Sequence, residues 1–163
     1  MGPIGGAGAS RPVVFRLRFP AMETTSLRRE IAADGTVTLV AGRGTYRYRR
    51  PRSGVLDIVI EGLDDGQFGT AALDEIAMAL LRERPLEIFV DTSAASMPAA
   101  AVSRQWGQFF ALNRKDLKRV SVLVSSKGVE LTIEIAQHLS HTGRLIQLYT
   151  DPEVFQAWRA GRA

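Results

Sequence analysis

The segment LEIFVDTS, residues 86–93, constrains the fold more than any other part of the chain. Its mainly apolar half, Leu86 to Val90, runs into Asp91, Thr92 and Ser93, which predicts a buried strand that ends in a polar loop. Pro85 closes a helical pattern before the strand, and the small-residue run AASMPAAA opens another helical pattern after it. The local order is therefore helix, strand, loop and helix.

Two further apolar runs, VLDIVIEG and RVSVLVSS, repeat this order, and LIQLY supplies a last strand. Alternating strand and helix patterns need crossover connections, which favour parallel strands. Thr70 is expected to cap the first helix, Ser96 and Pro98 to begin the second, and Asp151-Pro152 to begin a short last helix. We therefore predict an α/β fold with a mostly parallel four-stranded sheet and four helices.

The residues before this part carry β patterns instead. VVFRLRF and TYRYR alternate apolar or aromatic residues with arginine, and Asp34-Gly35 and Gly42-Arg43-Gly44 are turn signals. The first residues are mostly Gly, Pro, Ala and Ser. We divide the chain into a flexible tail (residues 1–12), an antiparallel β-extension (residues 13–52) that lies outside the main core, and an α/β domain (residues 53–163).

Composition narrows the class of protein. A chain of 163 residues, 45% hydrophobic and 23% charged, is ordinary for a globular domain. The absence of cysteine excludes disulfides and thiolate metal sites. No apolar run approaches the roughly 20 residues that span a bilayer, so we expect a cytoplasmic protein. The charge is uneven, because residues 1–52 hold ten arginines and three acids, whereas the remainder is slightly acidic.

The element order, the strand that ends in Asp91-Thr92-Ser93 and the aromatic-rich second helix resemble the STAS-like, SpoIIAA-like domains of anti-sigma factor antagonists. This resemblance implies a SpoIIAA-like sandwich and a non-enzymatic regulatory or protein-interaction module. In the phospho-regulated antagonists a serine pair follows the strand; here the matching positions are Ala100 and Ala101. A phosphorylation switch would need Ser93, Ser96 or Ser103 instead. The candidate interaction loop is Asp91, Thr92, Ser93 and Ser96.

Catalysis and metal binding have weak candidates. His138 and His141, three residues apart, could share a helix face, but two ligands without a third do not define a metal site. Ser93 or Ser96 with a histidine and Asp91 could form a triad, yet the sequence has no G-x-S-x-G elbow. We therefore expect no enzyme activity, no catalytic residue, no metal and no cofactor.

Two other surfaces have alternative interpretations. The acid-free run with Arg43, Arg47, Arg49 and Arg50 alternates arginine with tyrosine, a combination that suits phosphates and stacked bases. An acidic protein surface, or the acidic part of the same chain, is favoured over nucleic acid, and a solvated edge strand is the plainest reading.

Trp106, Phe109 and Phe155 form either helix core or an apolar pocket. Lipid-binding CRAL-TRIO relatives of the resembled domains imply the pocket. The alternative function is therefore a carrier of a lipid or other apolar small ligand, with a cavity of at least ~300 Å³. The expected partner is a protein, and a homodimer is left open.

Overall fold

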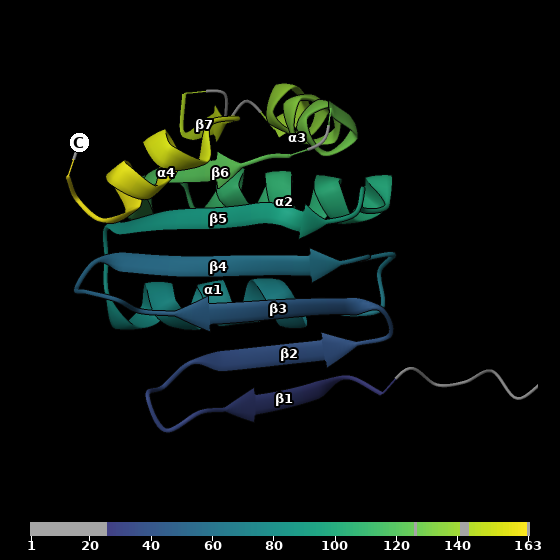
Figure 1. Cartoon of the computed structure of the whole chain (residues 1–163), viewed down its shortest axis with the longest axis horizontal. Coiled ribbons are helices and arrows are strands. Elements are labelled where there is room, and N and C mark those ends of the chain that lie inside the picture. Colours follow the sequence, from purple (N-terminus) through teal and green to yellow (C-terminus); the bar gives the residue numbers. More distant parts are fainter. Residues whose placement is uncertain (1–25, 126, 141–143, 163) are drawn as a thin grey trace, which may run out of the picture.

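The computed structural model describes residues 26–125, 127–140 and 144–162, and they form one seven-stranded sheet in the order β1-β2-β3-β4-β5-β6-β7 (Figure 1). The predicted tail and the VVFRLRF strand lie outside these residues. The strands are β1 (Arg28–Ile31), β2 (Val37–Ala41), β3 (Gly44–Arg49), β4 (Val55–Gly62), β5 (Leu86–Ala95), β6 (Leu117–Leu123) and β7 (Ile146–Tyr149).

The sheet has an antiparallel half and a parallel half. β1 to β4 pair antiparallel, and the turn between β2 and β3 consists of Gly42 and Arg43, as the sequence predicted. β4 to β7 pair parallel, so that Val59, Asp91 and Leu123 lie side by side on three neighbouring strands. The predicted fold class, a mostly parallel four-stranded sheet preceded by antiparallel strands, is confirmed.

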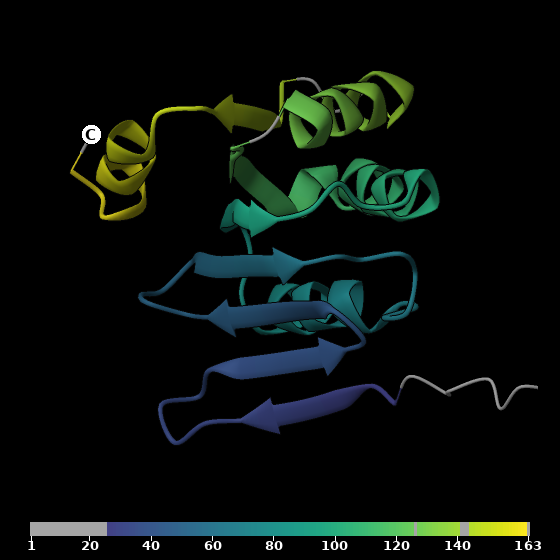
Figure 2. The same cartoon turned by 45° about the vertical axis from the view of Figure 1, so that its right-hand side comes forward.

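Helices connect the parallel strands and cover the two faces unequally. The helices are α1 (Ala71–Arg82), α2 (Ala100–Leu112), α3 (Lys127–Ser140) and α4 (Pro152–Arg159), with a short 3-10 turn at Arg114–Asp116. Apolar residues of α1, α2 and α3 join one cluster on one face of the sheet, which we call the helix face. α4 packs against the opposite face through a second cluster that contains Phe89 and Phe155 (Figure 2). Because side chains alternate along a strand, β5 supplies both clusters.

Local signals explain where the helices begin. Asp151 caps α4 as predicted, since its Oδ1 atom accepts hydrogen bonds from the backbone N–H of Glu153 (2.8 Å) and Val154 (3.3 Å). Thr70 occupies the N-cap position of α1, but its hydroxyl donates to Asp74 (2.9 Å) and makes no cap bond. α2 begins at Ala100, later than Ser96 or Pro98. Among the described residues, none of the helices has the length and apolar composition needed to cross a bilayer.

The expectation that residues 13–52 lie outside the main core is wrong for β2 and β3, whereas β1 is exposed along its whole length. Tyr46 and Tyr48 of β3 and Leu39 of β2 are buried in the same cluster as the strands of the α/β part. β3 also pairs with β4 along its whole length. The physical reason is that each tyrosine buries a large apolar ring while its hydroxyl keeps a hydrogen-bond partner. The division at residues 52 and 53 into separate domains remains a prediction.

The central strand is longer than predicted. Asp91, Thr92 and Ser93 lie within β5 and not in a loop, because the backbone continues to pair until Ala94 and Ala95 lie beside Glu61 and Gly62 of β4. The polar side chains of Asp91, Thr92 and Ser93 did not end the backbone pairing of the strand. The connection to α2 therefore consists of residues 96–99.

Candidate interaction surface and cavity

Hydrogen bonds hold the connection between β5 and α2 against its neighbours. The N–H of Ser96 donates to the carbonyl of Gly62 (2.8 Å), and the N–H of Ala99 donates to the carbonyl of Asp64 (3.0 Å). The Ser125 hydroxyl donates to the carbonyl of Ser93 (2.9 Å). The connection is therefore fixed at both ends, and side chains on it are presented in a defined arrangement.

The four residues of the predicted interaction loop have different environments. Asp91 Oδ1 accepts hydrogen bonds from the N–H (2.9 Å) and the hydroxyl (2.6 Å) of Ser93. Thr92 is buried and donates to the carbonyl of Leu123 (2.6 Å), so it supports the sheet. Ser93 and Ser96 are exposed, and Asp91 is half-buried. Three of the four residues can therefore contact a partner.

An exposed apolar strip beside this connection was not found from the sequence. Met97, Leu131 and Ile135 are 57%, 58% and 52% exposed. Met97 lies over the start of α3, where a Cβ atom added to Gly128 would be 3.4 Å from its sulfur. Positions 128, 131 and 135 share one side of a helix. We call Met97, Leu131 and Ile135 the apolar strip; the wide apolar stripe of α3 was the sequence signal that could have revealed it.

The weak candidates for chemistry gain no support. His138 is exposed on α3, and His141 lies outside the described residues. Asp91 and Ser93 bond to each other, but no histidine in the described part of the chain bonds to either of them. The same residues contain no group of three His, Asp or Glu side chains that could hold a metal ion.

Three of the four candidate basic residues pair with acids of the same chain. Arg47 lies 3.4 Å from Glu61, Arg49 lies 3.4 Å from Asp57, and Arg50 lies 2.8 Å from Glu83. Arg43 is exposed in the turn before β3. Arg47 and Arg49 point away from the helix face, since Tyr46 and Tyr48 point into it. One alternative raised from the sequence was that these arginines pair with acidic residues of the same chain. The structure has such pairs for Arg47, Arg49 and Arg50.

Asp57 lies at the centre of the contacts that hold α4. Its side chain is only 3% exposed, and its Oδ2 atom accepts from Arg159 at 2.9 Å and from Arg49 at 3.4 Å. Its Oδ1 atom has no hydrogen-bond partner. A separate contact joins α4 to β6, where the Arg119 guanidinium lies 4.3 Å from the centre of the Trp158 ring. α4 is therefore fixed by charge as well as by Phe155.

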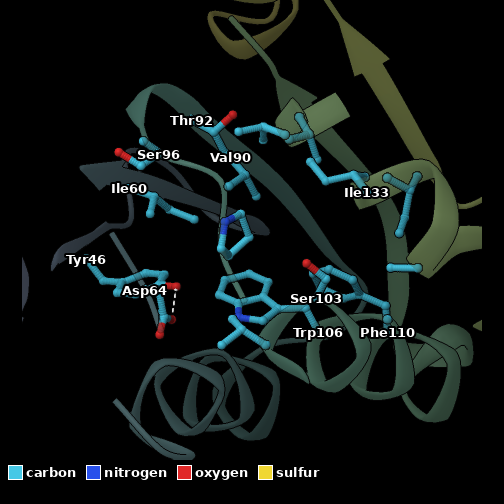
Figure 3. A pocket seen from close by; sticks show the side chains of 18 of the residues that line it. Tyr46, Ile60, Asp64, Val90, Thr92, Ser96, Ser103, Trp106, Phe110 and Ile133 are labelled. Atoms are coloured by element: carbon cyan, nitrogen blue, oxygen red, sulfur yellow. Dashed lines mark hydrogen bonds between the residues drawn. The ribbon is translucent and has the colours of Figure 1, made fainter. Parts of the chain in front are cut away.

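A cavity of about 90 Å³ lies between the helix face of the sheet and helices α2 and α3 (Figure 3). Strands β3 to β7 contribute to its wall. Of the three predicted pocket residues, only Trp106 lines it. Phe109 packs against the main core, and Phe155 lies on the opposite face of the sheet. The predicted grouping is wrong because helical spacing cannot show which face of a sheet a distant helix covers.

The cavity wall has one buried polar pair, Tyr46 and Asp64. The Tyr46 hydroxyl donates to Asp64 Oδ2 at 2.5 Å (Figure 3). The other carboxylate oxygen of Asp64 accepts from the N–H of Gly66 at 2.9 Å. Burial raises the pKa of the Tyr46 phenol far above its usual range, and the hydrogen bond to Asp64 raises it further. The phenol therefore remains a proton donor to Asp64.

Comparison with known proteins gives matches of fold, and these are with solved structures. A scan against protein-family models finds no match, and a search of curated proteins finds none. A search of solved structures finds an anti-sigma factor antagonist from Mycobacterium paratuberculosis, with 18% sequence identity, 82% of this chain and 100% of that chain covered, and a TM-score of 0.48. This is the class of protein that the sequence resembles. The identity and the TM-score are too low to transfer a partner or an activity.

Proposed function

We propose that the protein is a non-enzymatic, cytoplasmic regulatory module that binds a protein partner through the β5–α2 connection and the apolar strip. The observation that carries this proposal is the exposure of three large apolar side chains next to a connection fixed by backbone hydrogen bonds. Exposed apolar patches with polar rims are typical of protein interfaces. A fixed connection also loses little conformational entropy on binding.

The chemistry around the strip fits a protein partner. Ser93, Ser96 and Asp91 supply hydroxyls and a carboxylate at its edge, where an interface usually has a polar rim. The first turn of α2 exposes Ala100 and Ala101, whose small side chains let another backbone approach closely. The carrier alternative is not favoured, because the cavity of about 90 Å³ is smaller than the ~300 Å³ that it requires.

The proposal predicts that a charge in the apolar strip removes partner binding. Tagged wild-type protein and the double variant Met97→Asp, Leu131→Asp are exposed side by side to extract of the source cells, and retained proteins are quantified by mass spectrometry. We expect at least one protein to be retained at least tenfold less by the double variant, because a buried unpaired carboxylate is costly. Circular dichroism checks that the variant is folded.

The matched control is Leu112→Asp, since Leu112 is 87% exposed at the far end of α2. It should retain the partner like the wild type. Equal retention by all three proteins would contradict the proposed surface. Hydrolase turnover that disappears in Ser93→Ala would contradict a non-enzymatic role.

A second prediction concerns the basic surface of β3. The triple change Arg47→Ser, Arg49→Ser, Arg50→Ser should lower the free energy of unfolding by less than about 3 kcal/mol, because exposed ion pairs contribute about 0–1 kcal/mol each and Arg159 still pairs with Asp57. If this surface steers an acidic partner, the triple variant should associate more slowly, and more so at low salt. Urea denaturation and association kinetics measure the two effects.

The control for that experiment removes three positive charges elsewhere, at Arg82, Arg104 and Lys115, which are exposed on other parts of the molecule. Equal slowing in both triple variants would show that only net charge matters. Unfolding of the β3 triple variant would show that the arginines are structural.

A further inference from the structure

We propose that the cavity between the sheet and helices α2 and α3 is a binding site for a small, uncharged, mainly apolar molecule, such as a short-chain alcohol or ketone. This inference does not depend on the proposed partner binding. It rests on the size of the cavity, on the charge of its wall and on the way the wall is held open.

The size excludes most larger ligands. The cavity measures about 90 Å³, whereas an apolar cavity of about 150 Å³ accepts benzene. Voids much larger than one water molecule are few in a close-packed interior. The space therefore suits a molecule with a few carbon atoms and is too small to enclose a long acyl chain.

The charge of the wall excludes anions. Among the described residues that line the cavity there is no Lys, Arg or His, and Asp64 is the only acid. Both Asp64 oxygens already accept hydrogen bonds, from Tyr46 and from Gly66. A carboxylate or phosphate group inside would meet no cation and would be repelled by Asp64. A neutral ligand avoids this cost.

Polar atoms at the rim suit one uncharged polar end. Ser96 and Ser103 line the cavity, and Ser96 is exposed while Ser103 is half-buried (Figure 3). Each hydroxyl can donate and accept a hydrogen bond. Thr92 also lines the cavity, but its hydroxyl is bonded to the carbonyl of Leu123. A ligand with an apolar body and a hydroxyl or carbonyl end would match this arrangement.

The walls cannot easily collapse into the space. Trp106 lies against Tyr46 and Phe110, with ring centres 5.8 Å apart in both pairs. Gly107, buried within α2, contributes only backbone to the wall. Glycine inside a helix costs about 1 kcal/mol relative to alanine. At position 107 it adds no side chain to the wall, so the cavity keeps space that a larger residue would fill.

The test uses three probes of equal length: 1-butanol, butyrate and butylammonium. Each is titrated into isotope-labelled full-length protein while amide signals are followed by NMR. We expect 1-butanol to cause saturable shifts centred on Val90, Val102 and Ile133, which line the cavity. Butyrate and butylammonium should bind at least tenfold more weakly, because each would lose the hydration of its charge and both Asp64 oxygens already accept hydrogen bonds. Butylammonium binding as tightly as 1-butanol would contradict an uncharged ligand.

A filled cavity provides the decisive variant. Ala136→Met places a larger side chain at a buried position of the wall and should weaken 1-butanol binding at least tenfold. Ala111→Met, on α2 away from the cavity, should bind like the wild type. If Ala136→Met does not fold, Ser103→Leu at the rim replaces it. Unsaturable shifts, shifts outside the wall, equal binding by the filled variant, or butyrate binding as tightly as 1-butanol would each overturn the proposal.

Discussion

Replacement of Tyr46 by alanine should lower the free energy of unfolding by about 3–5 kcal/mol, the range for removal of a large buried aromatic side chain. Tyr46 is 2% exposed. Its ring packs edge-on against Phe68, with centres 4.7 Å apart, and stacks on Trp106. Urea denaturation of wild type and variant measures the loss.

Two comparison variants separate the contributions. Tyr46→Phe keeps the ring but removes one of the hydrogen bonds of the buried Asp64, and should cost about 1–3 kcal/mol. Arg47→Ala, at the next position of β3 but on the opposite face, should cost no more than about 1 kcal/mol. A Tyr46→Ala variant as stable as Arg47→Ala would contradict the finding that β3 belongs to the main core.

Arg159→Ala should lower the free energy of unfolding by about 3 kcal/mol. The change leaves the buried Asp57 carboxylate with Arg49 alone, at 3.4 Å and largely in solvent. Loss of one partner of a buried ion pair costs more than the pair itself contributes, because the remaining charge stays desolvated. Urea denaturation at neutral pH measures the loss.

The matched control is Arg49→Ala, which leaves the 2.9 Å contact between Arg159 and Asp57 and should cost less than about 1 kcal/mol. The double variant Asp57→Asn, Arg159→Ala should lose less free energy of unfolding than the sum of the losses of the two single variants, since no buried charge remains in it. Strict additivity would show that Arg159 acts through packing and not through Asp57.

The parallel half of the sheet could be predicted because its signals are local. Apolar runs and the Asp151 cap act over a few residues, and the structure confirms them. The turn at Gly42, in the antiparallel half, is an equally local signal. The alternation in β3 predicted that Tyr46 and Tyr48 share one face, but not that this face belongs to the main core. Tyr46 and Tyr48 alternate with arginine as they would on an exposed edge strand, and only the contact with Trp106 and Phe68 shows that their face is covered.

The candidate site was predicted less completely than the fold. Sequence placed Asp91, Ser93 and Ser96 at the carboxyl end of the central strand, where the structure also has them. It could not reveal the apolar strip, because Met97 and Leu131 are 34 residues apart and meet only through the start of α3. The sequence also suggested that Phe155 and Trp106 line one pocket. They lie on different faces of the sheet, and the sequence does not show which face each helix covers.

The order of the strands in the sheet has a consequence for how the chain folds. Each strand from β2 to β7 pairs with the strand directly before it in the sequence. A polypeptide leaving the ribosome could therefore extend the sheet one strand at a time, without waiting for a distant segment to be synthesised. Contacts between neighbours in sequence also favour rapid folding. α4, which carries Phe155 and Arg159, would dock last and complete the face that the other helices leave open.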